Sequence, residues 1–329
     1  MSSTDIQRIE LLIRISNQIS RYFSIFIFFG GTIGNIFNII ILSDRSIRKL
    51  PSVFLFLIAS IASLIAIHLG LITRMLSGWA SDPTYTIGWL CKLRTFLVFV
   101  SRAVVFWLFV LATIDRLLLS STENRQRRLS TMKNAQRGAL FVIIMSIIIY
   151  AQLFYCYEAN LTNAPFQCYA KSSSCQLLTD MTFASFTTIV PLLLMLIFGL
   201  MTISNIRESH RRLCQTSIET MAHRLSPSQQ RSKKMERHLL FMVFTQVLVL
   251  AILTLPQAIQ RLHAAFIGPY NSQLQATKDM FVYNIVLLLT YLASAMPFYI
   301  YTLTGGTLFR KPLLNLMQRI YRLISCRRF

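Results

Sequence analysis

Residues 91–116 read CKLRTFLVFVSRAVVFWLFVLATIDR. The stretch opens on Cys91 and closes on the pair Asp115-Arg116, and between Thr95 and Ile114 its only charged residue is Arg102. At about 1.5 Å of rise per residue, a helix of this length covers roughly 37 Å, which exceeds a hydrocarbon core of about 30 Å. One helix can therefore carry a cysteine on one side of a bilayer and a charged pair on the other.

The composition of the whole chain also indicates a membrane protein. Hydrophobic residues make up 54% of the 329 residues and charged residues only 14%, with a mean hydropathy of +0.54. Soluble domains carry about 25% charged residues, so a soluble fold could not hide this much apolar surface. The formal net charge of +21 does not indicate nucleic-acid binding, because the basic residues lie between apolar runs and form no nucleic-acid-binding motif.

No chemistry of catalysis or metal binding is visible in the sequence. The six cysteines form no CxxC pair and no His/Cys cluster with zinc spacing, so we expect no metal site and no cofactor. The apolar runs contain neither paired carboxylates nor a His/Asp metal set. We therefore expect a protein that is not an enzyme.

Seven apolar stretches are long enough to span a bilayer, and we expect an all-α membrane protein built as a seven-transmembrane helix bundle over residues 22–303. Residues 1–21 would form an N-terminal tail, either on the membrane surface or poorly ordered. Residues 304–329 would form a tail with an amphipathic helix in the interface, because apolar and basic residues alternate there at helical spacing. The expected spans are about 22–42, 51–76, 91–120, 138–157, 183–206, 238–262 and 280–303.

The distribution of basic residues predicts the orientation. Of the 33 Lys and Arg residues, 23 fall in residues 45–49, 116–137 and 207–237 and in the C-terminal tail from Arg310. By the positive-inside rule the C-terminus is then cytoplasmic and the N-terminus extracellular. The sequon Asn160-Leu161-Thr162 and the cysteines Cys91, Cys168 and Cys175 all fall on the expected outer side, so Asn160 is a candidate glycosylation site.

A set of short motifs follows the spans in order: Gly34-Asn35 in the first, Cys91 and Asp115-Arg116-Leu117 at the two ends of the third, Pro191 in the fifth, Pro256 in the sixth and Pro297-Phe298-Tyr299-Ile300-Tyr301 in the seventh. Their order and spacing resemble a rhodopsin-like (class A) G-protein-coupled receptor, and the likeness covers about residues 23–326. Within that family the chain looks most like invertebrate orphan or neuropeptide-type receptors.

Several positions depart from the family pattern. Ser63 stands where the family has the aspartate of a sodium site, and Thr254 replaces a tryptophan often treated as a toggle. In the seventh span Tyr301 matches the family tyrosine in one register, whereas aligning Pro297 with the family proline puts Ile300 there. The resemblance thus implies an altered activation relay, with Asn35, Pro256, Pro297 and Tyr301 as its candidate residues.

The resemblance implies a role for each end of residues 91–116. Cys91 would form a disulfide with Cys168, or with Cys175 as the second choice, and so tie the third helix to the loop over the pocket. At the other end, Asp115 would hold Arg116 until a conformational change frees the guanidinium for a G protein. The alternative for Arg116 is a snorkelling anchor at a helix end.

Arg102 lies 14 positions before Arg116, about 21 Å away by helical rise, in the half of the span where the family binds ligands. An intramembrane charge faces a partner or a water-filled cavity, so Arg102 either bonds to neighbouring helices or contacts a carboxylate or carbonyl-rich peptide end. Val98 occupies the position where amine receptors carry aspartate, which argues against a biogenic amine. The further candidate pocket residues are His68, Arg74, Gln257, Gln260, Arg261, Tyr283 and Asn284, each equally suited to a hydrogen bond between helices.

The expected function is that of a plasma-membrane receptor that binds an extracellular peptide or small molecule and activates a heterotrimeric G protein. The alternative is a transporter or channel for a small solute, but we find no internal repeat and no acid well inside a span. Cys326, which lies beside Arg327 and Arg328 at the end of the tail, is a candidate palmitoylation site.

Overall fold

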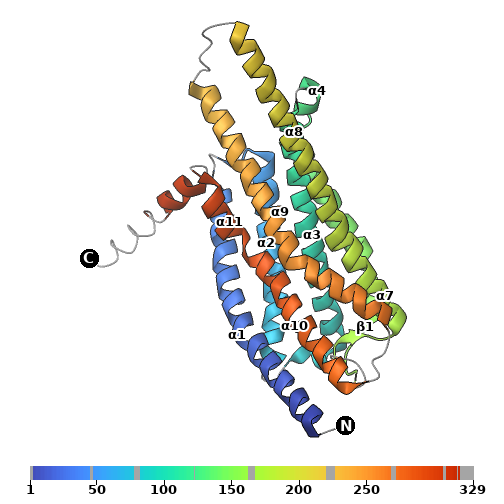
Figure 1. Ribbon diagram of the computed structural model, residues 1–329. Coiled ribbons are helices and arrows are strands. Elements are labelled where there is room, and N and C mark those ends of the chain that lie inside the picture. The colour runs from blue at the N-terminus through green and yellow to red at the C-terminus, as the bar shows by residue number, and fades with distance from the viewer. Residues whose placement is uncertain are drawn as a thin grey trace, which may run out of the picture.

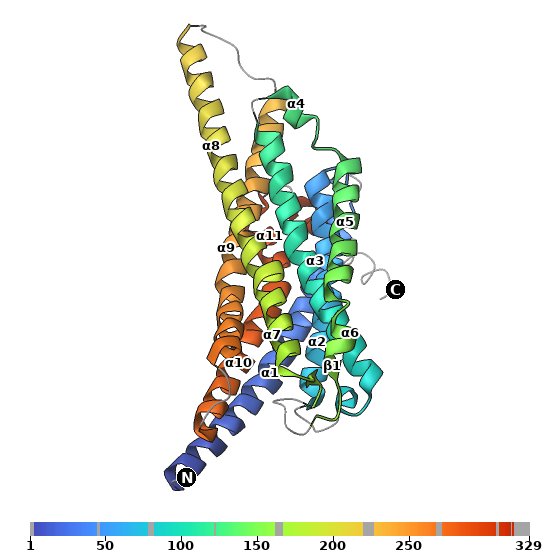
Figure 2. The ribbon, with the colours of Figure 1, turned by 90° about the vertical axis from the view of Figure 1, so that its right-hand side faces the viewer.

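Helix α3 (Gly88–Ser120) contains the stretch of residues 91–116 and forms the centre of the structure. In its most apolar window 78% of the residues are buried, against 33% for the fourth span (Met132–Cys156). Small residues such as Ala103 and Ala112 are fully buried and let neighbouring helices approach closely. The helix runs along the bundle from the end that carries the β hairpin to the end that carries α4 (Figures 1 and 2).

The computed structural model describes residues 3–44, 47–77, 82–121, 123–161, 167–219, 227–267, 272–306, 309–316 and 318. Among these residues, six helices are long and apolar enough to cross a membrane, and the bent pair of α10 and α11 would add a seventh. The other long helices are α1 (Ser3–Leu42), α2 (Pro51–Ser77), α5 (Met132–Tyr150), α8 (Val190–Glu219), α9 (Pro227–Ile267) and α10 (Gln273–Ala295). The expectation of an all-α seven-helix bundle is confirmed in its architecture.

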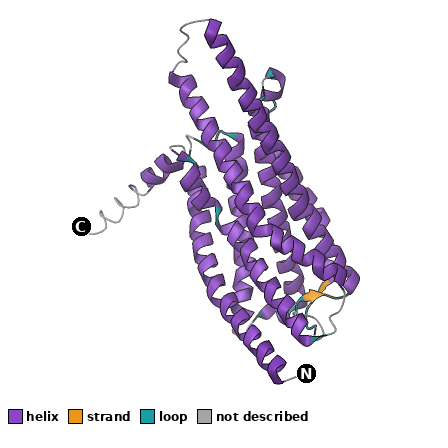
Figure 3. Ribbon diagram, in the orientation of Figure 1, coloured by secondary structure: helices purple, strands orange, loops and turns teal. Residues whose placement is uncertain are grey.

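Short elements mark the two ends of the bundle (Figure 3). The hairpin end carries the two-residue strands β1 (Tyr157–Glu158) and β2 (Tyr169–Ala170), the 3-10 helix η1 (Pro83–Tyr85) and the N-terminus. The opposite end, called the α4 end here, carries α4 (Asn124–Arg127). The remaining elements are α6 (Leu153–Cys156), α7 (Ser173–Thr182), the π-helical segment η2 (Phe183–Ile189) and α11 (Pro297–Thr304).

Several helices are longer than the apolar stretches alone predicted. Helix α1 begins at Ser3, so residues 3–21 of the expected separate tail are continuous with the first span, because no proline or glycine interrupts the chain before Gly30. Helices α8 and α9 likewise extend into the basic segment 207–237, which was expected to be a loop. Hydrophobicity therefore predicted the apolar part of each helix. It did not predict how far α1, α8 and α9 extend into the polar residues beside it.

Backbone irregularities occur near two of the prolines noted in the sequence. The π-helical segment η2 ends two residues before Pro191, and α10 and α11 meet next to Pro297 with a bend of 47°. Proline lacks the N–H that would continue the helical ladder, and its ring clashes with the preceding turn. Residues 309–316 begin the expected amphipathic helix as a helical segment, while residues 319–329 lie outside the described part of the chain.

Candidate functional sites

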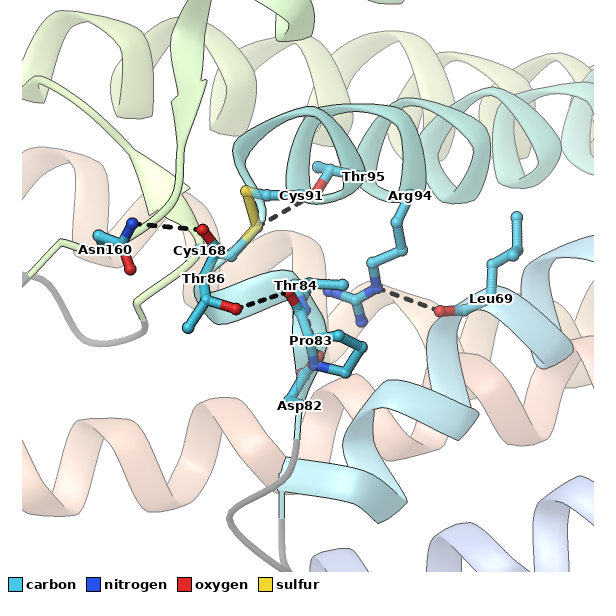
Figure 4. Close-up of a disulfide and its surroundings, with 10 residues drawn as sticks. All are labelled: Leu69, Asp82, Pro83, Thr84, Thr86, Cys91, Arg94, Thr95, Asn160 and Cys168. Carbon is cyan, nitrogen blue, oxygen red and sulfur yellow. Dashed lines mark hydrogen bonds between the residues drawn. A yellow bond between two sulfur atoms is a disulfide. The ribbon is translucent and has the colours of Figure 1, made fainter.

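Two disulfides tie the hairpin end together. Cys91 at the start of α3 bonds to Cys168 with Cα atoms 5.7 Å apart, which is the first of the two pairings considered from the sequence (Figure 4). The second choice, Cys175 as the partner of Cys91, is wrong, because Cys175 bonds to Cys156 at the end of α6. Cys156 had been placed at the outer end of the expected fourth span, about 138–157, with no partner assigned, and in the structure it is the last residue of α6.

The hairpin of β1 and β2 forms a lid over the end of α3. Strands β1 and β2 pair antiparallel, with Tyr157 opposite Ala170 and Glu158 opposite Tyr169. The backbone N–H of Asn160 donates to the carbonyl of Tyr85 at 2.9 Å, and its side-chain amide donates to the carbonyl of Thr86 at 3.3 Å (Figure 4). The Cys91–Cys168 disulfide and these bonds hold the hairpin against α3 and η1.

Beneath this lid lies a cavity of about 90 Å³, called the lid cavity here. It is lined from α2, α3, α9, α10, η1 and the hairpin. Among the described residues, the charged side chains that line the cavity are four arginines and one carboxylate, Asp82. Its walls therefore carry net positive charge. The arginines are Arg74, Arg94, Arg102 and Arg261, and the tyrosines are Tyr85, Tyr157, Tyr169, Tyr283 and Tyr291.

Arg102 lines the lid cavity and also bonds to neighbouring helices. Its guanidinium donates to Thr290 Oγ1 at 2.6 Å and to Gln257 Oε1 at 3.5 Å, and it lies 4.2 Å from the ring centroid of Tyr291. Its Nε is buried without a hydrogen-bond partner among the described residues. The first alternative drawn from the sequence, bonds to neighbouring helices, is thus observed. Because Arg102 also lines a polar cavity, contact with a ligand stays a prediction.

Arg261 is held by a buried ion pair with Asp180, which lies on α7. The guanidinium also lies over aromatic rings, at 4.8 Å from the centroid of Phe183 and 5.4 Å from that of Phe99. Asp180 is 4% exposed and Arg261 6%, so the pair is almost fully removed from solvent. The pair connects α9 to the helix that continues from the lid.

The nine residues expected in a pocket divide into two groups. Arg74, Val98, Arg102, Arg261 and Tyr283 line the lid cavity, whereas His68, Gln257, Gln260 and Asn284 do not. Gln257 accepts from Arg102, Gln260 donates to Asp279 at 3.4 Å, and Asn284 joins helices by accepting from Arg74 at 2.7 Å and donating to Ser16 at 3.0 Å. These three polar residues contact neighbouring side chains and do not line the cavity.

Arg94 and the two lid tyrosines, Tyr157 and Tyr169, were not predicted from the sequence. Helical spacing could have indicated Arg94 as a pocket residue, because it lies four residues before Val98 and eight before Arg102, on one face of α3. Arg94 donates to the carbonyl of Leu69 at 3.1 Å (Figure 4). It also donates to the carbonyl of Gly70 at 3.3 Å. No local pattern indicated the tyrosines, since their position depends on the hairpin and its disulfide.

The lid tyrosines remain protonated hydroxyl groups. Burial raises the pKa of Tyr157 and of Tyr169 above the ordinary value of a phenol, because a phenolate loses its hydration in the enclosed site. Both can therefore donate a hydrogen bond to an acceptor in the lid cavity. Together with the arginines they make the cavity rich in donors.

A second cluster, called the Arg116 cluster here, lies at the α4 end of α3 and consists of Ser52, Asp115, Arg116 and Ser130. Arg116 Nη2 lies 2.5 Å from Asp115 Oδ2, and Arg116 Nε donates to Ser52 Oγ at 3.0 Å. Asp115 also accepts hydrogen bonds from the hydroxyls of Ser52 and Ser130. Arg116 is 4% exposed, so its charge is enclosed by partners and not extended toward solvent.

The Arg116 cluster borders a larger apolar cavity of about 640 Å³. Thr113 and Arg116 line it from α3, and the other walls come from α8 and α9, including Met195, Thr202 and Phe244. The two helices therefore do not pack closely against each other beside Arg116. This part of the bundle has room for α9 to change position.

The candidate relay residues lie on separate helices. Asn35 on α1 donates to the carbonyls of Gly31 at 2.9 Å and Ser294 at 3.1 Å, which joins α1 to α10. Tyr301 on α11 is fully buried, and its ring lies 5.1 Å from that of Phe56 and 5.9 Å from that of Phe309. Pro256 lies inside α9, and Pro297 is the first residue of α11. They form no single hydrogen-bonded cluster among the described residues.

Of the two expected modification sites, the structure describes Asn160 but not Cys326. Asn160 is exposed and adopts a left-handed backbone conformation with φ of 61°. Cys326, the candidate palmitoylation site, lies outside the described residues.

Comparisons with known proteins agree with this geometry. The family model described as 7 transmembrane receptor (rhodopsin family) matches residues 34–301, which is most of the chain and includes all the long helices in part or in full. A comparison with curated proteins gave no match. The matched family is one of multi-pass membrane receptors and not of enzymes. The chain, with its seven-helix bundle, its Cys91–Cys168 disulfide and its Asp115-Arg116 pair, belongs to the rhodopsin family of seven-transmembrane receptors.

Proposed function

We propose that this receptor binds an extracellular peptide at the lid cavity and activates a heterotrimeric G protein through the Arg116 cluster. The observation that carries the proposal is that one buried helix, α3, places a cationic cavity at one end and a restrained arginine at the other. A ligand that favours one arrangement of α3 and its neighbours would shift a two-state equilibrium at the far end. We place the receptor in the plasma membrane, with the N-terminus and residues 1–21 outside, the bundle over residues 22–303, and the tail from residue 304 in the cytoplasm.

Charge distribution supports this orientation. The basic connections lie at the α4 end, and the disulfides and Asn160 lie at the hairpin end. Disulfides form in oxidising compartments, and basic loops remain in the cytoplasm. Asn160 is our candidate glycosylation site on the outer side.

The size and charge of the lid cavity support an acidic end of a peptide as the group it receives. A volume of about 90 Å³ suits one terminal group or side chain and not a whole peptide. Arginine recognises carboxylates through paired N–H groups, and the lid tyrosines add neutral donors. We therefore infer that a C-terminal or side-chain carboxylate of the peptide enters the cavity beside Arg102, while the remaining residues contact the lid.

Replacing Arg102 with alanine is expected to raise the half-maximal concentration of an activating peptide about 10- to 100-fold, because a charge-assisted hydrogen bond contributes about 1.5–3 kcal/mol. The peptide is first identified by screening a peptide library on cells that display the receptor, and the response is read as nucleotide exchange. Amidating the peptide's carboxylate should weaken the response of the native receptor by a similar factor but add little for the variant. Gln260→Ala is the matched control, since Gln260 is buried at the same end but does not line the lid cavity.

Surface display of each variant is measured in parallel, because Arg102 also bonds to Thr290 and Gln257. An Arg102→Ala receptor that reaches the surface and responds at the native peptide concentration would rule out this role for Arg102.

The Arg116 cluster supports coupling because its arginine is bound by partners that a conformational change can remove. Asp115 and Ser52 together hold the guanidinium, and the 640 Å³ cavity leaves α9 free of close packing against α8. Movement of α9 about Pro256 would open this region and expose Arg116 to a G-protein segment. The snorkelling alternative fits less well, because Arg116 is enclosed by Asp115 and Ser52 and does not extend outward.

Asp115→Asn is expected to raise ligand-independent nucleotide exchange several-fold, because it removes the negative charge that holds Arg116 and leaves its guanidinium bonded only to uncharged acceptors. Arg116→Ala should reduce both basal and ligand-driven exchange toward the level of cells without receptor. Exchange is measured with co-expressed G proteins, and Ser146→Ala in α5 serves as a control, since Ser146 bonds only to its own helix at 2.8 Å among the described contacts. Unchanged exchange in Arg116→Ala would contradict the proposed coupling site.

A further inference from the structure

The connection between α3 and α5 contains a serine that follows two arginines: Arg127-Arg128-Leu129-Ser130. Residues 123–129 are all exposed, and Ser130 is half-buried. Serine/threonine kinases with acidic substrate clefts select arginines on the N-terminal side of the serine by charge complementarity. The basic run is therefore arranged as a substrate for such a kinase, on the side of the bundle that we place in the cytoplasm.

The Ser130 hydroxyl is part of the Arg116 cluster. It donates a hydrogen bond to Asp115 Oδ1, while Asp115 Oδ2 faces Arg116 Nη2 at 2.5 Å. This bond joins the loop to the carboxylate that holds Arg116. A change at the hydroxyl therefore acts directly on Asp115.

We propose that Ser130 is a phosphorylation site for an arginine-directed serine/threonine kinase, and that its phosphate releases the loop from Asp115. The Ser130 oxygen attacks the γ-phosphorus of ATP, the bond from that phosphorus to the bridging oxygen breaks, ADP leaves, and the hydroxyl proton passes to a base of the kinase. The phosphoserine cannot donate to Asp115, and it carries a charge of about −1.5 to −2 at pH 7. The hydrogen bond from Ser130 to Asp115 is thus replaced by electrostatic repulsion between the phosphate and the Asp115 carboxylate.

Local structure allows the serine to reach a kinase. Helix α4 is a single turn of four residues with no buried residue, so its hydrogen bonds are exposed to solvent. The segment is held by a few hydrogen bonds at its surface: Arg127 Nε donates to the carbonyl of Ser121 at 2.7 Å, and Asn134 Nδ2 donates to the carbonyl of Leu129 at 2.8 Å. A segment with so few buried contacts opens locally at low cost, and Ser130 then leaves Asp115 together with the loop.

The adjacent hydroxyl provides a contrast. Thr131 caps α5, its Oγ1 accepting from the N–H of Asn134 at 3.3 Å, and it begins the helix that continues to Tyr150. It lies one residue further from the arginine pair than Ser130 does. We therefore assign the modification to Ser130 and not to its neighbour.

The consequence for signalling rests on the proposed function. The phosphate attracts Arg116 as well as repelling Asp115, so it weakens the arrangement in which Asp115 and Ser52 hold the guanidinium. Phosphorylation is therefore expected to raise ligand-independent nucleotide exchange several-fold.

The first experiment treats the full-length receptor, purified in lipid nanodiscs, with ATP and the catalytic subunit of cAMP-dependent protein kinase as the arginine-directed probe. Phosphopeptides from a digest at glutamate are mapped by mass spectrometry. We expect phosphate on Ser130 in the native receptor and in Thr131→Ala, and none at this loop in Ser130→Ala. A native receptor without phosphate on Ser130, or with the phosphate on Thr131, would overturn the assignment.

The second experiment measures hydrogen–deuterium exchange and nucleotide exchange before and after kinase treatment. Kinase treatment should increase amide exchange over residues 123–131 in the native receptor. In Ser130→Ala, amide exchange and nucleotide exchange should be the same before and after treatment. Phosphorylation that leaves the loop amides equally protected, or that lowers nucleotide exchange, contradicts release of the loop from Asp115. Failure of the untreated receptor to activate any G protein would instead contradict the proposed function, since mapping and amide exchange do not depend on coupling.

Discussion

Replacing Cys91 and Cys168 together with serine is expected to lower the free energy of unfolding by roughly 4–5 kcal/mol in the chain-entropy model of disulfide stabilisation. The reason is the long loop that this bond closes, with a sequence separation of 77. Cys156→Ser with Cys175→Ser should cost about 3 kcal/mol, because that loop is shorter, with a separation of 19. The two double variants are matched, since each removes one disulfide and leaves no unpaired partner.

The measurement is the midpoint of thermal unfolding in detergent by circular dichroism, together with the amount of receptor at the cell surface. Loss of the Cys91–Cys168 bond should also abolish the response to the activating peptide, because it releases β2 and Tyr169 from the lid cavity. Equal midpoints for the native receptor and both variants, or a larger loss for the Cys156–Cys175 variant, would contradict this ranking.

Breaking the buried ion pair of Asp180 and Arg261 should have an effect of similar size. Asp180→Ala leaves the guanidinium of Arg261 buried without its carboxylate, and removing one member of a buried pair costs about 3–5 kcal/mol. The rings of Phe99 and Phe183 offset part of this cost by cation–π attraction, so we expect a value near 3 kcal/mol. Thermal unfolding and surface display measure the loss.

The double variant Asp180→Ala with Arg261→Met tests whether the uncompensated charge is the cause. Methionine fills the space of the arginine stem without a charge, so the double variant should recover much of the stability lost by Asp180→Ala. Gln260→Ala is the neighbouring control and should cost about 1 kcal/mol or less, because its hydrogen bond to Asp279 is long, at 3.4 Å. A double variant that is less stable than Asp180→Ala would show that the arginine stabilises the helix through its ring contacts and not through the pair.

The sequence alone was sufficient to predict the seven-helix bundle and the marked residues at the two ends of α3. Each span could be predicted because hydrophobic length is a local property that the bilayer requires. The order of Cys91, Arg102 and Asp115-Arg116 on one helix also followed directly, since helical rise converts sequence separation into distance. The membership of the family and the positions of its marked residues were therefore visible before any tertiary contact.

The contents of the two sites were predicted only in part. Val98 and Arg102 could be placed on one face of α3, but Gln257 and Asn284 looked equally suitable and instead join neighbouring side chains. Which side of a spanning helix faces a cavity depends on its rotation and tilt. In a membrane these are decided by packing against other helices, since lipid and protein interior are both apolar.

Tertiary structure alone decided the contacts between segments that are distant in sequence. The pairing of Cys156 with Cys175, the burial of Asp180 against Arg261 and the bond from Ser130 to Asp115 all depend on how the connecting segments fold back onto the helices. By itself the sequence determined the spans, their order and the charged ends of α3, because these follow from hydrophobicity and helical geometry. The lid, the cavity and the hydroxyl that bonds to Asp115 required the folded structure, because they arise where separate segments meet.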